Sequence, residues 1–137
     1  VADGVNYVLN RTHVSGLSSS TYINNGIDQA SKTGTSDNSA SSSAFVGYTP
    51  DISTSVVVAG DNTSAAWQNT PEQSRNVMTI PLSALNGRSL GSYASIGAGA
   101  LWRPIMQEAM DGMPQSKFTK WVAPASTSTA SSPSTSR

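Results

Sequence analysis

The hydrophobic positions of the first dozen residues recur at helical spacing and predict a short helix packed through one face. Gly16 and the serines at 18–20 are expected to end it. A second apolar stripe at 100–110 predicts another helix, closed by Gly112 and Pro114. Because proline is tolerated in the first turn of a helix, we expect this one to begin at Trp102 or Arg103, just ahead of Pro104. The two stripes are Val1, Val5, Tyr7, Val8 and Leu9, and Leu101, Ile105, Met106, Ala109 and Met110.

Between these helices the pattern predicts three strands. Residues 44–49 and 54–59 are rich in β-branched and aromatic side chains, and Pro50-Asp51 separates them as a turn. Residues 27–35 follow an Asn-Gly turn and hold few apolar side chains, which favours an edge strand. Together they predict an antiparallel sheet in which the chain meanders outward from the strand of Lys32. Residues 61–97 are left unplaced, with Asn86-Gly87 as a candidate hairpin turn.

Composition divides the chain into an ordered part and a tail. Residues 123–137 contain no large apolar side chain and are predicted to form a flexible Ser/Thr-rich tail, so 1–122 is the expected domain. The opening residues lack the pattern of a signal peptide, so we expect the chain to begin inside a longer protein or to lack its own export signal.

Charge and residue types exclude several classes of function. Eight basic residues balance eight acidic ones, which argues against binding nucleic acid or an anionic membrane surface. No cysteine is present, which excludes disulfides and thiolate metal sites. The longest aliphatic run, at 56–59, is too short to span a bilayer, so no membrane segment is expected in this chain.

The motif Lys32-Thr33-Gly34-Thr35 is the most informative stretch of the sequence. Ten residues later the chain reads FVGYTP, and the stretches VADGVNYVLNRT, SVVVAGD and LWRPIMQEAM accompany these two in order. From Val1 to about Phe118 the chain therefore resembles the C-terminal part of the transpeptidase domain of class A (bifunctional) penicillin-binding proteins. It departs from them at Ser31, where they usually have glycine, and at Ala44, where they often have tryptophan.

The resemblance implies an α+β fold in which an antiparallel sheet is flanked by helices, the C-terminal portion of the penicillin-binding and serine β-lactamase fold. It implies that the whole protein cross-links peptidoglycan stem peptides through a serine acyl-enzyme, without a cofactor, and that β-lactams acylate the same serine. The expected location is the outer face of the bacterial cell membrane, with the anchor in an upstream segment.

For the motif itself, the resemblance and the chemistry of its residues agree on a role. Lys32 and Thr35 are the expected catalytic residues, with the backbone N–H of Thr35 forming half of an oxyanion hole. The predicted substrate-binding residues are Thr33, Gly34 and Thr35, because the two hydroxyls suit a carboxylate and Gly34 lets another backbone lie against the strand. The alternative is a purely structural role, in which Lys32 only protects an exposed strand edge from aggregation.

The nucleophile of this family is not encoded here. It lies in a Ser-x-x-Lys element, and none of the three lysines of this chain has serine three positions earlier. Ser36-Asp37-Asn38 matches the family's Ser-x-Asn element but follows the lysine motif instead of preceding it, so it is interpreted as a turn. The partner is therefore the upstream part of the same domain. Two alternatives stay open: a non-catalytic peptidoglycan- or protein-binding module, and a D,D-carboxypeptidase or β-lactamase fragment.

The remaining candidates favour structural roles. His13, the one histidine, lies near a predicted helix end and is interpreted as a surface residue or as a complement to the helix dipole, and no ligand set for a metal accompanies it. Asp51 and Asp61 bracket a strand and lie too far apart to work as a pair. The tripeptides at 10–12 and 62–64 fit the glycosylation pattern, which is too common to decide anything. The methionines are expected to fill the core: Met78, Met106, Met110 and Met113.

Overall fold

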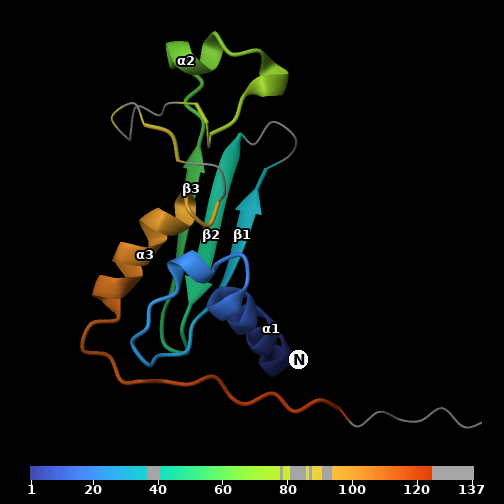
Figure 1. The fold of residues 1–137 in the computed structure, drawn as a ribbon, viewed down its shortest axis with the longest axis vertical. Coiled ribbons are helices and arrows are strands. Elements are labelled where there is room, and N and C mark those ends of the chain that lie inside the picture. The colour runs from blue at the N-terminus through green and yellow to red at the C-terminus, as the bar shows by residue number, and fades with distance from the viewer. Residues whose placement is uncertain (37–40, 78, 81–85, 87, 91–93, 125–137) are drawn as a thin grey trace, which may run out of the picture.

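The computed structural model describes residues 1–36, 41–77, 79–80, 86, 88–90 and 94–124. Three strands form an antiparallel sheet in the order β1-β2-β3: β1 (Ala30–Thr35), β2 (Ser42–Tyr48) and β3 (Ser53–Ala59). Figure 1 shows the meander, with β1 and β3 on the two sides of β2. The predicted α+β class and the strand order are confirmed. The edge strand starts three residues later than 27, because Ile27 is a buried core residue in the preceding loop.

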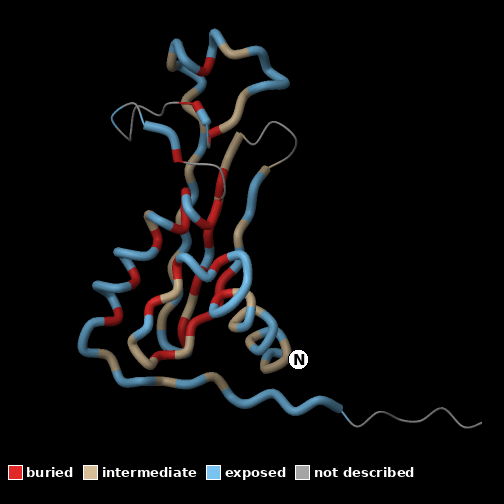
Figure 2. The backbone as a smooth tube through the Cα atoms, viewed as in Figure 1, coloured by how far each residue is buried: buried red, intermediate tan, exposed pale blue. Residues whose placement is uncertain are grey.

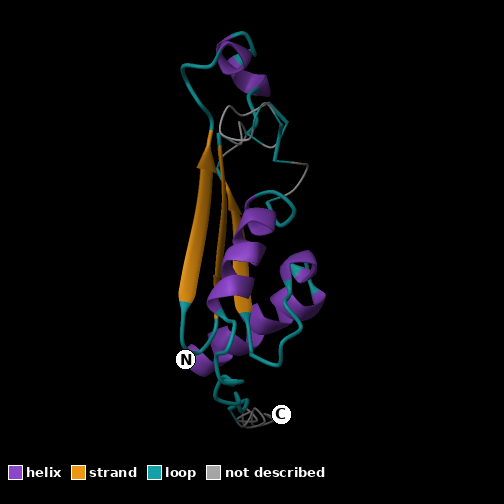
Figure 3. Ribbon diagram, turned by 90° about the vertical axis from the view of Figure 1, so that its left-hand side faces the viewer, coloured by secondary structure: helices purple, strands orange, loops and turns teal. Residues whose placement is uncertain are grey.

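Helices lie on one side of this sheet and at its ends. The longer ones are α1 (Ala2–Ser15) and α3 (Ala98–Ala109), and the shorter ones are η1 (Ser19–Thr21), α2 (Ala65–Gln68) and η2 (Glu72–Ser74). The view in Figure 3 shows α3 running along one face of the sheet and leaving the opposite face uncovered. A hydrogen bond of 2.7 Å from the Asn10 amide to the Gln29 carbonyl ties α1 to the residue before β1.

The main core lies between α3 and the sheet. Phe45 of β2 and Trp102 of α3 are fully buried, and their ring centroids are 5.1 Å apart. Gly47 faces the Trp102 indole so closely that a Cβ at this position would collide with it. The indole N–H donates to the Thr54 carbonyl at 3.2 Å, so the largest side chain of the core is also satisfied as a donor. In Figure 2, buried stretches recur along α3 and along β2.

A second, smaller apolar cluster lies beyond the far end of β3. It is formed by Trp67, Val77, Ile80 and Leu90, with Val58 of β3 and Leu101 of α3 packed against it. Ser64 begins α2 by accepting a hydrogen bond from the Trp67 N–H. This cluster accounts for part of the segment 61–97 that the sequence pattern does not place, because its apolar residues are single and widely spaced.

The start of α3 was predicted wrongly. The helix begins at Ala98, four residues before Trp102, and Pro104 lies inside it. Small residues at the helix start explain the difference: Ala98 and Gly99 are buried, and a Cβ on Gly99 would collide with Thr21 and Phe45. Tertiary packing therefore extends the N-terminal end of the helix along the sheet, although Pro104 then lies in the helix interior. Ile105, expected in the buried stripe, is half exposed, while Trp102, Met106 and Met110 fill the core.

The apolar stripe of α1 was also expected to pack, and this was wrong. Val1, Val5 and Val8 are each at least half exposed, and the side of α1 that turns inward carries His13. Of the remaining predictions, those for Asp37, Asn38, Met78 and Gly87 and for most of the tail fall outside the described residues.

Candidate functional site

The motif Lys32–Thr35 occupies most of β1, which is an edge strand of the sheet. β1 pairs with β2 on one side, and no other described strand pairs with its second edge. Gly34 is exposed, and a Cβ built on it would meet only the Ala44 Cβ at 3.6 Å. Another extended backbone can therefore approach this edge without first displacing a side chain.

The side chains of the motif alternate between the two faces of the sheet. Thr33 lies opposite Phe45 and so belongs to the face that α3 covers, whereas Lys32 lies opposite Val46 on the open face. By the same alternation Thr35 accompanies Thr33, and Gly34 accompanies Lys32. The lysine and the two hydroxyls thus share the free edge of the strand, and they do not share a face.

Thr33 and Thr35 line a hollow of about 270 Å³. Its other lining residues in the described part of the chain are Leu17, Ala94 and Ser95, so these residues bring hydroxyl groups and apolar surface to the walls. Hydroxyls both donate and accept hydrogen bonds, which suits a carboxylate or a peptide group of a ligand. The structure brings the two predicted threonines together with Ser95, a residue that no sequence motif singles out.

Lys32 is exposed, and its ammonium group lies against its own strand. Nζ donates to the Thr33 carbonyl at 2.8 Å. This single bond to an exposed carbonyl leaves two of the three ammonium hydrogens for a ligand. The group places a positive charge at the edge of β1, and no described carboxylate forms an ion pair with it.

The two positions that depart from the family pattern have distinct surroundings. Ser31, immediately before Lys32, is buried, and its hydroxyl reaches no hydrogen-bond partner in the described part of the chain. Ala44 is half-buried and pairs with Gly34 across β1 and β2. Because the side chain at position 44 is small, it leaves open space beside Gly34.

His13 is a residue whose setting was predicted wrongly. Its imidazole is fully buried among three aromatic rings, with centroid distances of 5.8 Å to Tyr22, 6.4 Å to Phe45 and 5.6 Å to Trp102. Burial lowers its pKa to about 4, an effect that the backbone of Thr21 partly opposes. His13 follows Leu9 by one helical turn, a spacing that could have pointed to an inward-facing ring.

The acidic residues that bracket β3 serve local structure. Asp61 accepts hydrogen bonds from the Thr63 hydroxyl at 2.7 Å and from the Thr63 N–H at 2.9 Å. These bonds, led by the hydroxyl, lower the pKa of the Asp61 carboxyl. Asp51 lies in the turn after β2, at the opposite end of β3, so the two do not form a pair.

No group of three or more potential metal ligands occurs among the described residues. Within the same residues, no helix is long and apolar enough to cross a membrane. Comparisons of the chain with models of protein families, with curated proteins and with solved structures found no match.

Proposed function

We propose that this chain forms the lysine-motif wall of a D,D-transpeptidase active site in a peptidoglycan-synthesising penicillin-binding protein. The observation that carries the proposal is the exposed, glycine-containing edge of β1, which holds Lys32 and both threonines of the motif where an extended peptide could add to the sheet. A stem peptide is such a ligand: its terminal carboxylate suits the hydroxyls of Thr33 and Thr35, and the Lys32 ammonium lies at the same edge of the strand on the other face.

In this proposal the chain supplies only part of the chemistry. The attacking serine comes from the upstream part of the domain, and Lys32 helps to hold that hydroxyl ready for proton transfer. The backbone N–H of Thr35 stabilises the oxyanion of the acyl-transfer intermediate. Thr33 and Thr35 hold the substrate carboxylate, and β-lactams react at the same serine as substrate analogues.

The open face of the sheet supports the need for an upstream part. Val46 and Val57 present apolar surface on this face, and Lys32 lies beside them. Such a surface is usually covered in a complete domain. The covering segment would place its own residues next to Lys32, on the side where the nucleophile is required. The protein would act at the outer face of the bacterial cell membrane.

Labelling with a fluorescent penicillin tests this proposal. We expect the isolated chain to remain unlabelled, and its complex with the upstream part to be labelled. Lys32→Ala in that complex should lower the labelling rate about a hundredfold or more, because general acid–base catalysis contributes on that scale. Lys120→Ala, which removes an exposed lysine far from β1 in sequence, is the matched control and should label normally.

Two results would contradict the proposal. Normal labelling of Lys32→Ala would remove this lysine from the mechanism. A complete protein without any penicillin-reactive serine would instead favour a binding module that uses the edge of β1 without chemistry. Labelling followed by rapid release of a hydrolysed product would favour a carboxypeptidase or β-lactamase.

A further inference from the structure

A hollow of about 350 Å³ lies between α1 and the C-terminal segment 114–122, here called the strap. None of the motif residues Lys32–Thr35 lines it. Its walls come from one side of α1, from the residues before β1 and from the strap itself. The lining residues are Asn6, Tyr7, Asn10, Asp28, Lys117, Phe118, Thr119, Lys120 and Trp121.

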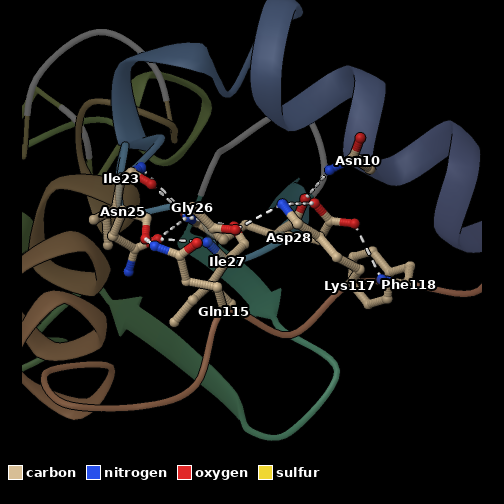
Figure 4. Close-up of polar contacts among 10 residues, drawn as sticks. Asn10, Ile23, Asn25, Gly26, Ile27, Asp28, Gln115, Lys117 and Phe118 are labelled. Carbon is tan, nitrogen blue, oxygen red and sulfur yellow. Dashed lines mark hydrogen bonds and ion pairs between the residues drawn. The ribbon is translucent and has the colours of Figure 1, made fainter.

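Asp28 fixes the strap in place beside α1. Its carboxylate accepts a hydrogen bond from the Phe118 N–H at 3.0 Å and pairs with the Lys117 ammonium at 3.2 Å. Lys117 also donates to the Gly26 carbonyl at 2.6 Å, and the Asp28 N–H donates to the Ser116 carbonyl at 3.0 Å. Figure 4 shows these bonds joining the strap to the loop that precedes β1. These bonds fix residues 116–118 of the strap against the loop before β1, so this side of the hollow is ordered before a ligand arrives.

Among the described residues, three aromatic rings line the hollow, those of Tyr7, Phe118 and Trp121, and two of them contact each other. Tyr7 of α1 and Trp121 of the strap lie with their ring centroids 5.2 Å apart. Each keeps a large exposed fraction, 43% for Tyr7 and 38% for Trp121. Large aromatic surfaces that stay exposed at a concave site are typical of ligand binding.

The polar part of the hollow is an amide pair on one face of α1. Asn6 uses its side-chain oxygen to accept from the Tyr48 hydroxyl at 2.7 Å, which leaves its NH₂ group as a donor. Asn10 uses its NH₂ group to donate to the Gln29 carbonyl, which leaves its oxygen as an acceptor. One helical turn apart, the two side chains offer a donor and an acceptor, each oriented by a bond to the sheet region.

Charge argues for a neutral ligand. Asp28 and Lys117 neutralise one another, so among the described lining residues Lys120 is the cation outside that pair. Beside the hollow, the Arg11 guanidinium lies over the Tyr7 ring, 5.7 Å from its centroid. A phosphate or a polyanion would meet too little positive charge. A ring with an apolar face and hydroxyl or amide substituents matches an aromatic platform beside an amide donor and acceptor.

We propose that this hollow binds a pyranose unit of a glycan, with the sugar ring against Trp121 and Tyr7 and its hydroxyl or amide substituents hydrogen-bonded to Asn6 and Asn10. The inference does not rest on the proposed function, because it uses neither β1 nor any acyl transfer. The volume of the hollow, about 350 Å³, lies at the low end of the range for small-molecule sites and fits one or two sugar units.

The test is a titration of the full chain with chitotriose, followed by amide NMR shifts and tryptophan fluorescence. We expect shifts at the strap and at Asn6, Asn10 and the Trp121 indole. Trp121→Ala should weaken binding about tenfold or more, because it removes the stacking surface. Leu17→Ala removes an exposed apolar side chain at the other hollow and should bind chitotriose like the parent chain. Circular dichroism of each variant checks that the fold is retained.

Other outcomes of the titration would overturn this inference. Absence of shifts with chitotriose and with maltotriose would exclude a saccharide site, and so would shifts at residues outside the hollow. Stronger binding of a proline-rich peptide than of either sugar would make the hollow a peptide site. The titration and the penicillin labelling are independent measurements, so a failure of saccharide binding can be told apart from a failure of the proposed function.

Discussion

At the scale of single residues, His13 is the feature that most affects the stability of the fold. Among the described residues it is the titratable side chain enclosed by the aromatic core, and neither ring nitrogen meets a partner in good hydrogen-bond geometry, so the nearby Thr21 backbone offsets only part of the cost of burial. A charged imidazole in this position would lie among Phe45, Trp102 and Tyr22 without a counter-ion. The folded chain therefore holds His13 in its neutral form.

We predict that the free energy of unfolding falls as the pH drops from 6.5 towards about 4. In this window the unfolded chain binds a proton at His13 and the folded chain does not, so stability rises with pH. The full difference in pKa corresponds to about 3 kcal/mol. Urea unfolding measured across this range checks the prediction. His13→Phe should remove this part of the pH dependence, and an unchanged slope in that variant would assign the effect to other groups.

At the scale of secondary structure, α3 shows packing overcoming a local preference. Pro104 lies in the helix interior, where it cannot donate to the Ala100 carbonyl. The helix persists because Ala98, Trp102 and Met106 bury one face against the sheet. Packing of an amphipathic face supplies more stability to a helix than its intrinsic propensity does.

We predict that Pro104→Ala stabilises the chain by about 2 kcal/mol. The substitution restores a helical hydrogen bond, and the gain is reduced by the greater freedom of the unfolded chain. Thermal and urea unfolding measure the change. Gln107→Ala, at an exposed position of the same helix, is the control and should change stability by less than about 0.5 kcal/mol. A loss of stability in Pro104→Ala would show that the proline shapes the helix to fit the sheet.

At the scale of the whole molecule, the sheet is covered on one face only. Val56 of β3 packs against the core under α3, whereas its neighbour Val57 is 64% exposed on the opposite face. The valines of the apolar stripe of α1 are exposed as well, so the described residues leave apolar surface on α1 and on the open face of the sheet. This agrees with the proposal that an upstream part covers it.

We predict that Val57→Thr lowers the binding of a hydrophobic dye to the chain and leaves its stability nearly unchanged. Threonine keeps the β-branched shape and removes apolar surface from the open face. Val56→Thr is the matched variant and should lose about 1–2 kcal/mol, because it places a hydroxyl on the covered face. Equal effects of the two substitutions on urea unfolding would mean that both faces of β3 are covered.

Local patterns in the sequence predict the three strands, their antiparallel order and a helix near each end, because β-branched runs, turn residues and helical periodicity act over a few residues. They also single out Lys32, Thr33, Gly34 and Thr35 as one motif. What they cannot predict is which face of each helix packs, because that choice depends on contacts distant in sequence.

Only the tertiary structure decides that His13 turns inward while Val5 and Val8 turn outward, since the aromatic rings around His13 come from a loop, β2 and α3. It also places Ser95 beside the motif threonines and closes the strap over α1 through Asp28 and Lys117. The sequence by itself determined the three strands, the presence of the two long helices and the motif, because these arise from neighbouring residues. The surroundings of each site were decided by segments that meet only when the chain folds.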